Sequence, residues 1–392
     1  MKRFRFIAVV TVHALFLVVF SFFLLGISYS YENESSIISG VSVLKNVIFG
    51  LEEKPSRKDF LLINVSYEKA LNPKLDEFGF SIGNEAITNR ESLAKLFEKT
   101  SAFNNHTYIV CDVFLEQSSP ADSLLLQNVQ RTSNIVFPFH AVEGVMTMPV
   151  IKVPTAFSDY DSDFGNFLKY KFIQYDTCST IALKMYKDIH HASYTSGLLF
   201  DRKNDHRALK SFIIEFPIRQ YDIFRDDTLG YHSFHLGNLL ELPDPLLRDI
   251  LKDKIIVVGD FLEEDLHQTI YGTTAGPLIH LNAYLNLRDN KNNLSGWFFL
   301  YLFSCYLLFS YVLIRNVSLV HLRVIQWIQK SKAGSFIFDY LKYAFFLLIM
   351  SIVSYLVFGI HLNILIMSLY FSLAEYVIEY IDSKRKLKLS HP

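Results

Sequence analysis

Four long apolar segments constrain this 392-residue chain more than any other feature of its sequence. One lies near the N-terminus, and three follow one another at the other end, at residues 297–314, 340–358 and 362–381. A helix of about 20 apolar residues spans the hydrocarbon core of a bilayer. The hydrophobic content of 51% also exceeds what an ordinary soluble domain needs. We therefore expect four transmembrane helices, at least one of which precedes any large folded domain.

The first apolar segment ends at residue 27 and follows a short basic start. A cleaved signal peptide is the alternative for residues 1–27, but the apolar run is longer than a typical signal core and no A-x-A cleavage site follows it. We expect an uncleaved helix. His13 lies inside it, where an ionisable side chain is a functional candidate. A neutral imidazole that hydrogen-bonds a neighbouring helix is the simpler expectation.

The basic residues predict the orientation of these helices. They gather at the start of the chain, after the second apolar segment and at the end, as Lys2, Arg3, Arg5, Arg315, Arg323, Lys330, Lys332, Lys384, Arg385, Lys386 and Lys388. With four spans, all three groups fall on the same side, which is the cytoplasmic side by the positive-inside rule. We expect residues 28–296 outside, 315–339 as a basic amphipathic cytoplasmic loop, and 382–392 as a cytoplasmic tail.

Residues 253–290 are the stretch around which the segment outside the membrane is organised. Four β-branched residues at 255–258 precede Gly259, which predicts a strand buried on both faces of a parallel sheet. A polar loop follows, and then Gly276 and Pro277 open a helix, since proline suits the first helical position. Ligands of open α/β sheets bind beyond the carboxyl ends of such strands. Any ligand site is therefore expected here.

Other segments complete an α/β pattern. Strands are predicted at residues 59–65, 108–114 and 135–139, with less regular edge strands at 166–174 and 212–216. Helices are predicted at 124–129, 180–187 and 246–251, and another is capped by Thr88 or Asn89. The βαβαβ order implies right-handed crossovers and a mostly parallel sheet. The expected fold class is an α/β domain with a mostly parallel sheet, flanking helices and four transmembrane helices.

The organising stretch resembles the end of the CHASE2 domain, an extracytoplasmic sensory module of bacterial membrane receptors. The matching positions are Gly259, Asp265, Thr269, Gly272, Gly276, Pro277, Ile279 and His280. The front half of that family is matched by Asn89, Arg90, Asp112, Phe114, Asp122 and Leu124. The resemblance covers roughly residues 35–290. One departure is that Asn64, Ser66 and Tyr67 stand where family members commonly end the first strand with an acidic residue.

The resemblance implies one transmembrane helix before the domain and three after it, in the bacterial inner membrane. Family members often continue into a kinase or cyclase, whereas this chain has about a dozen residues after its last apolar segment, so a signal is expected to pass to a separate partner protein. The resemblance and the carboxylates of the loop together indicate a ligand site formed by Asp112, Asp122, Asp260, Asp265, Thr269 and His280. A solvated acidic rim is the simpler alternative for the loop carboxylates.

The sequence contains none of the motifs that identify common enzyme sites. A Walker A loop, a dinucleotide-binding glycine fingerprint, a G-x-S-x-G elbow and an H-E-x-x-H helix are all missing. The three cysteines follow no metal-ligand spacing, and Cys111 and Cys178 are either free or bridged. A net charge of −1 indicates no nucleic-acid partner. We expect no enzyme activity, no cofactor and no metal.

The leading functional hypothesis is a multi-pass membrane sensor. It would bind an unknown small ligand or envelope component and act on a signalling partner, or on a second copy of itself, through helices in the lipid bilayer. The first alternative is a structural scaffold for envelope proteins that binds no ligand. The second is an envelope hydrolase that uses Asp112, Asp122 and Asp265.

Overall fold

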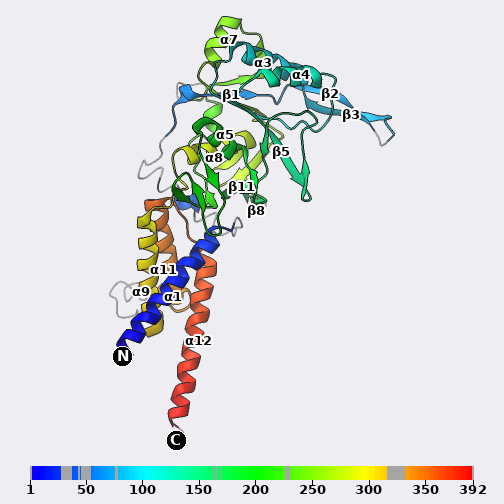
Figure 1. Cartoon of the computed structure of the whole chain (residues 1–392). Helices are drawn as coiled ribbons and strands as arrows, with labels where there is room; N and C mark the ends of the chain where they lie inside the picture. The colour runs from blue at the N-terminus through cyan, green and yellow to red at the C-terminus, as the bar shows by residue number, and fades with distance from the viewer. Residues whose placement is uncertain are drawn as a thin grey trace.

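The computed structural model describes residues 2–27, 38–42, 45, 54–75, 78–160, 162–163, 166–167, 169–225, 230–315 and 332–390. An α/β domain stands on a bundle of long helices, and both chain ends lie at the far end of that bundle (Figure 1). Residues 316–331, most of the predicted basic loop, lie outside the described residues.

A seven-stranded sheet forms the centre of the α/β domain, in the order β17-β1-β18-β4-β5-β6, with β7 beside β5. These strands are β1 (Phe60–Asn64), β4 (Tyr108–Asp112), β5 (Ile135–Val142), β6 (Val145–Thr147), β7 (Thr155–Phe157), β17 (Ser233–His235) and β18 (Ile255–Gly259). All neighbours pair in parallel except β5 and β6. The predicted mostly parallel sheet is therefore confirmed.

Strand β18 lies in the middle of this sheet, and all five of its residues are buried. Its side chains alternate between two cores, because successive residues of a strand point to opposite faces. Ile256 and Val258 belong to the core that α3 (Arg90–Phe103) and α4 (Asp122–Arg131) cover. Ile255 and Val257 belong to the core on the other face, under α5 (Ile181–His190) and α8 (Gly276–Arg288).

Two hairpins interrupt the regular alternation of strands and helices. The first, the β2–β3 hairpin, joins β2 (Lys69–Leu75) to β3 (Ser81–Thr88) and projects away from the sheet (Figure 1). Asn89 then caps α3 as predicted, since its Oδ1 accepts hydrogen bonds from the amides of Glu91 and Ser92. The second, the β19–β20 hairpin, joins β19 (Leu266–Thr269) to β20 (Gly272–Ala275) where the sequence predicted only a polar loop.

The segment between β7 and β17 contains short elements, as its irregular pattern indicated. They are β8 (Ser162–Asp163), β9 (Asn166–Phe167), β10 (Lys169–Lys171), β11 (Ile173–Gln174), β12 (Cys178–Ser179), β13 (Tyr194–Thr195), β14 (Asp201–Lys203), β15 (His206–Ala208), β16 (Ser211–Ile213) and the 3-10 helix η3 (Gln220–Ile223). The predicted edge strands are present but do not extend the central sheet. β10 pairs with β16 instead. The sides of the central sheet are already occupied by β17, β6 and β7.

The remaining elements of the domain are the 3-10 helix η2 (Arg57–Asp59), α6 (Leu236–Leu240) and α7 (Asp244–Leu251). Helix α8 begins at Gly276 with Pro277 in its first turn, as predicted, and residues 276–287 are all buried. The predicted helices at 124–129, 180–187 and 246–251 correspond to α4, α5 and α7. The cysteines Cys111, Cys178 and Cys305 are free thiols.

The bundle consists of α1 (Lys2–Leu25), α9 (Gly296–Arg315), α11 (Lys332–Phe358) and α12 (Ile364–Ser390). Within the described residues, three segments are long and apolar enough to cross a membrane, Phe4–Leu25, Gly296–Arg315 and Ile364–Ile381. In α11, the apolar stretch Tyr343–Phe358 is shorter than these three segments. The chain thus has the character of a membrane protein, and the fourth span stays a prediction.

His13 connects three helices of the bundle. Its Nδ1 lies 2.7 Å from the Ser310 hydroxyl of α9, and its Nε2 lies 2.8 Å from the Tyr370 hydroxyl of α12. The expectation that this imidazole hydrogen-bonds neighbouring helices is therefore confirmed.

Candidate functional site

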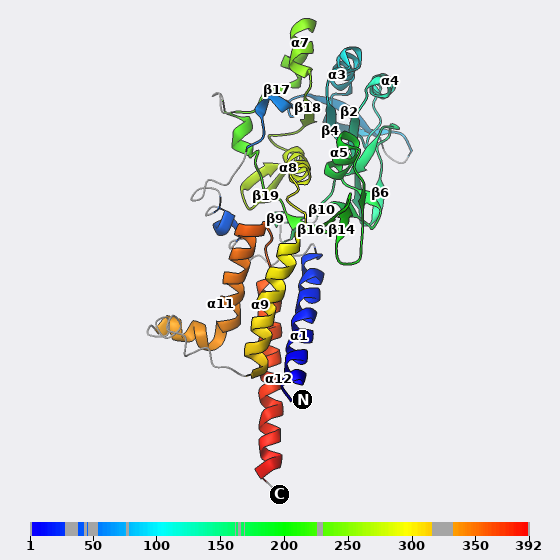
Figure 2. The same cartoon turned by 60° about the vertical axis from the view of Figure 1, so that its left-hand side comes forward.

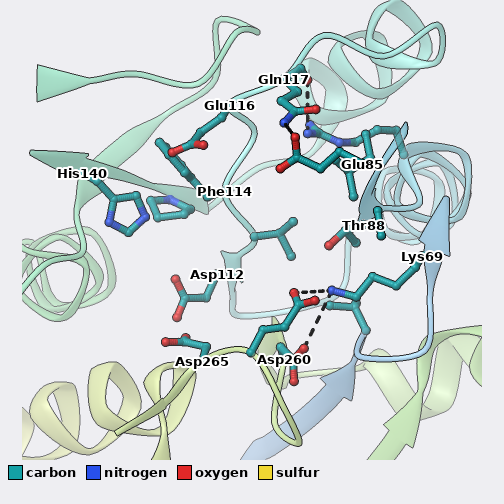
Figure 3. Close-up of a pocket in the computed structure, with 17 residues that line it drawn as sticks. Lys69, Glu85, Thr88, Asp112, Phe114, Glu116, Gln117, His140, Asp260 and Asp265 are labelled. Carbon is teal, nitrogen blue, oxygen red and sulfur yellow. Dashed lines mark hydrogen bonds and ion pairs between the residues drawn. The ribbon is translucent and has the colours of Figure 1, made fainter. Parts of the chain in front are cut away.

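A pocket of about 320 Å³ opens at the carboxyl ends of β18, β4 and β5, where the base of the β2–β3 hairpin covers the edge of the sheet. The register of the sheet brings Asn64, Gly259 and Asp112 to the same level at the ends of three adjacent strands. The strand ends, the loops that follow them and the β2–β3 hairpin supply the polar side chains of the pocket (Figure 3). The site lies where ligands bind in open α/β sheets.

Asp112, the last residue of β4, is the most unusual side chain of this pocket. Only 8% of the side chain is exposed, and within the described residues its Oδ2 has no hydrogen-bond partner. Burial, and to a smaller extent the neighbouring Asp265 carboxylate, raise the pKa of Asp112 well above its ordinary value. A buried acceptor without a donor costs stability, so this position is not explained by its contribution to the fold.

Asp265 faces Asp112 across the pocket (Figure 3). Its carboxylate is paired with His267, whose Nε2 lies 2.6 Å from Oδ1. Its backbone carbonyl accepts a hydrogen bond from the amide of Gly276 at 2.8 Å. The loop before α8 is therefore held by the backbone of Asp265, and the carboxylate both pairs with His267 and lines the pocket.

His280 lies behind Asp112 and does not line the pocket. Its Nε2 is 3.8 Å from Asp112 Oδ2, which is too far for a hydrogen bond, and its Nδ1 lies 3.2 Å from the Tyr170 hydroxyl. Burial lowers the pKa of His280 to about 4. The imidazole is consequently neutral near pH 7 and does not neutralise Asp112.

The surroundings of Asp260 shift its pKa in the direction opposite to that of Asp112. Burial alone would raise its pKa, but hydrogen bonds from the Ser66 hydroxyl and from the amides of Glu263 and Leu262 lower the pKa of Asp260 below its ordinary value. The amide bonds of 2.9 and 3.0 Å also fix the turn after β18. This carboxylate is ionised, and it shapes the loop as well as the pocket.

Asn64 occupies the strand end where the resembled family commonly has an acid. Its Oδ1 accepts hydrogen bonds from the Ser66 and Phe261 amides, at 3.1 and 3.3 Å, and lies 2.6 Å from the Ser66 hydroxyl. Its Nδ2 lies 3.3 Å from Nδ1 of His235 on β17. The Asn64 side chain therefore connects the turns after β1 and β18 by hydrogen bonds, and its role is structural.

Replacing Asn64 by Ala should lower the free energy of unfolding by about 1–3 kcal/mol, because it leaves buried donors without an acceptor. Thermal melts of the purified full-length protein measure the loss. Asn64→Asp is the matched control, since it keeps an acceptor at Oδ1 and should lose less. Equal melting midpoints for the wild type and Asn64→Ala would contradict this role.

The two cationic side chains of the pocket already have partners. Lys69 forms an ion pair with Glu264 and lies 3.9 Å from Asp260 Oδ2 (Figure 3). Arg90 is buried, with its Nη1 3.8 Å from Asp122 Oδ1, and burial lowers its pKa despite that neighbour. Asp122 therefore lies beyond the lining, on the far side of Arg90.

The structure brings some of the predicted ligand residues together and separates others. Asp112, Asp260 and Asp265 line one pocket, whereas Asp122, Thr269 and His280 do not. Thr269 closes the β19–β20 turn, where its hydroxyl donates to the Gly272 carbonyl at 2.8 Å. Sequence reasoning missed further polar lining residues, among them Lys69, Glu85, Gln117 and His140.

A cluster of Ser158, His140 and Asp159 near the pocket bears on the hydrolase alternative. Asp159 pairs with Nδ1 of His140, and the Ser158 hydroxyl lies closest to the same nitrogen, at 3.0 Å, and 3.3 Å from Nε2. A nucleophile and an orienting acid need opposite ring nitrogens to form a relay. Ser158 is also buried, so this trio does not have the geometry of a catalytic triad.

Among the described residues, no group of three or more His, Cys, Asp or Glu side chains is arranged to hold a metal ion. No protein-family model, curated protein or solved structure matches the chain. The functional conclusion therefore depends on the geometry of the pocket and on its connections to the helical bundle.

Proposed function

We propose that this chain is a membrane sensor with a CHASE2-like domain, in which a small ligand in the pocket changes the arrangement of the bundle helices. The observation that carries the proposal is Asp112, a buried carboxylate without a hydrogen-bond donor, at the carboxyl edge of the sheet. A side chain that costs stability and faces a pocket is typical of a binding site. A ligand acts by binding one of two arrangements more tightly than the other.

The β19–β20 hairpin is one route from the pocket to the bundle. It begins next to Asp265 and turns at Tyr271, and its strand β19 lies above the upper end of α11 (Figure 2). The Tyr271 hydroxyl lies 2.7 Å from the Ser42 hydroxyl, and Tyr355 of α11 is a close neighbour of Tyr271. The ring of Tyr271 packs 5.2 Å from that of Phe216. A displacement of the Asp265 loop would therefore reach α11 through one short hairpin.

Helix α8 is the second route. Asn282 and Asn286 hold the chain at residues 215–218 by hydrogen bonds to both the amide and the carbonyl of Ile218 and of Glu215. A short connection then leads into α9, whose Phe298 is fully buried and packs against Phe22 of α1. Since α8 is buried along its length, it moves only together with its surroundings.

We place the α/β domain outside the cytoplasm and both chain ends in the cytoplasm of a bacterium, with four spans in the inner membrane. This proposal is supported by the basic residues near both ends, and by the position of both ends at the far side of the bundle from the domain (Figure 1). Reporter fusions to the two ends test it. Activity of a periplasm-specific reporter at either end would contradict this topology.

Thermal-shift screening of the full-length protein against metabolites and cell-wall fragments tests the sensor. We expect at least one compound to raise the melting midpoint of the wild type. Asp265→Asn should abolish that rise and shift the unliganded midpoint little, because its exposed pair with His267 contributes at most about 1 kcal/mol. A large fall in the unliganded midpoint would make Asp265 structural, and a folded protein that no compound stabilises would contradict sensing.

A scaffold for envelope proteins is the second candidate, and exposed apolar side chains on two hairpins favour it. Leu71, Phe78, Phe80 and Ile82 are exposed on the β2–β3 hairpin, and Val142 and Val145 on the hairpin of β5 and β6. Contiguous exposed apolar surface often marks a protein contact. Crosslinking with mass spectrometry separates the two functions, since a scaffold should capture a stoichiometric partner whether or not a pocket ligand is present.

A further inference from the structure

The charges that line the pocket are unbalanced. Six carboxyl side chains line it, Glu85, Asp112, Glu116, Asp260, Glu264 and Asp265, against two cationic side chains. Both cations have an acidic neighbour, because Lys69 pairs with Glu264 and Arg90 lies beside Asp122. A negatively charged ligand would meet a surplus of like charge here.

The surplus of negative charge is concentrated between Asp112 and Asp265. Their carboxyl groups face one another across the pocket (Figure 3), and the charge of Asp265 disfavours ionisation of Asp112. The Asp265 carboxylate is paired with His267, whereas the nearest imidazole to Asp112, that of His280, stays neutral near pH 7. A positive charge placed there would remove the repulsion and supply the donor that Asp112 Oδ2 lacks.

The other walls of the pocket suit an organic molecule better than a bare ion. Phe114 lines the pocket, and its ring packs edge-on against His140 at 4.2 Å between ring centroids. An aromatic face attracts alkyl groups and cationic nitrogen. The volume of about 320 Å³ falls in the range of small-molecule sites, and the described residues offer no set of three metal ligands.

On the premise of the sensor function above, we propose that the ligand is a small organic cation. A protonated amine lies between Asp112 and Asp265, and the carbon atoms attached to it lie against Phe114. Charge-assisted hydrogen bonds from an ammonium group to two carboxylates are the contacts that hold it.

Isothermal titration of the full-length protein in nanodiscs tests this with matched probes. Putrescine, ethanolamine and glucosamine are compared with 1,4-butanediol, ethylene glycol and glucose, which have the same carbon skeletons without the amine. Succinate and Mg²⁺ serve as the anionic and metal probes. We expect saturable binding of at least one amine, none of its uncharged counterpart, and affinity at least about tenfold lower in Asp112→Asn and in Asp265→Asn.

Glu98→Gln is the matched control, because it removes one exposed carboxylate of α3 outside the pocket and should leave amine affinity unchanged. Binding of succinate, of Mg²⁺ or of the uncharged probes without any amine would overturn the cationic ligand and leave the sensor standing. Amine binding that persists in both pocket variants would overturn the assigned position. A protein that neither these probes nor the wider screen affects would contradict the sensor itself.

Discussion

Replacing Asp112 by Asn should raise the melting midpoint of the unliganded full-length protein at neutral pH, although most substitutions of buried residues lower it. Ionisation of Asp112 is unfavourable in the folded protein, because the carboxyl group is buried without a hydrogen-bond donor to Oδ2 and Asp265 faces it (Figure 3). Asparagine has nearly the same shape and carries no charge. Removing a buried, uncompensated charge stabilises a folded protein, and the gain is about 1.4 kcal/mol for each unit by which the pKa is raised.

The gain should depend on pH in a defined direction. Because the pKa of Asp112 is raised in the folded protein, the folded state binds this proton more tightly than the unfolded chain does. The carboxyl group therefore has no effect at pH values below its ordinary pKa of 3.8, destabilises the fold increasingly as pH rises above 3.8, and has its full effect above the raised pKa. The difference between Asp112→Asn and the wild type should be largest at mildly alkaline pH and disappear towards pH 3.8.

Melting curves of the wild type, Asp112→Asn and the control Glu98→Gln over this pH range measure the effect. The other titratable groups around Asp112, namely Cys111, Asp265, His280, Tyr160 and Tyr170, are present in all three proteins, so the comparison isolates Asp112 together with its coupling to them. A lower midpoint for Asp112→Asn at alkaline pH would show that the carboxylate stabilises the fold and would remove the argument for a ligand.

Gly259→Ala should be among the most destabilising single substitutions in the domain. A Cβ atom at Gly259 would lie 2.4 Å from Cγ and 3.2 Å from Cβ of Pro277, the second residue of α8. The proline ring is rigid and buried, so α8 would have to move away from the end of β18. Overpacking of this kind costs about 1–3 kcal/mol, and we expect the upper part of that range.

Gly296→Ala is the matched control for this prediction, because a Cβ at Gly296 meets no atom within 4 Å. Thermal melts should show a lower midpoint for Gly259→Ala and an unchanged one for Gly296→Ala. The displaced helix would also carry the Asp265 loop with it, so ligand binding should weaken in the first variant alone. An unaltered midpoint for Gly259→Ala would mean that α8 does not pack this closely on β18.

The centre of this fold could be predicted from the sequence because its signals are local. Four β-branched residues before a glycine predicted β18, and the Gly276-Pro277 pair predicted the start of α8. The strand ends at Asp112 and Gly259 then followed from the rule that parallel strands end at the same edge. That rule placed Asp112, Asp260 and Asp265 near one another, and they line a single pocket.

The rest could not be predicted because it depends on contacts between segments far apart in the chain. Asp122 lies beside Arg90 and outside the pocket lining, and His280 is hydrogen-bonded to Tyr170 behind that lining. The β2–β3 hairpin supplies Lys69 and Glu85 from a stretch whose strand pattern is weak. The β19–β20 hairpin pairs with the distant β9, and it forms the link to α11 that a polar loop would not provide.

The most direct test of coupling between the pocket and the bundle is amide hydrogen exchange of the full-length protein in nanodiscs, with and without saturating putrescine. The account predicts slower exchange in the Asp265 loop and the β19–β20 hairpin, together with a change at the end of α11 beside Tyr355. None of these changes should occur in Asp112→Asn. Bound putrescine that alters exchange only at the pocket, or nowhere, would contradict the account.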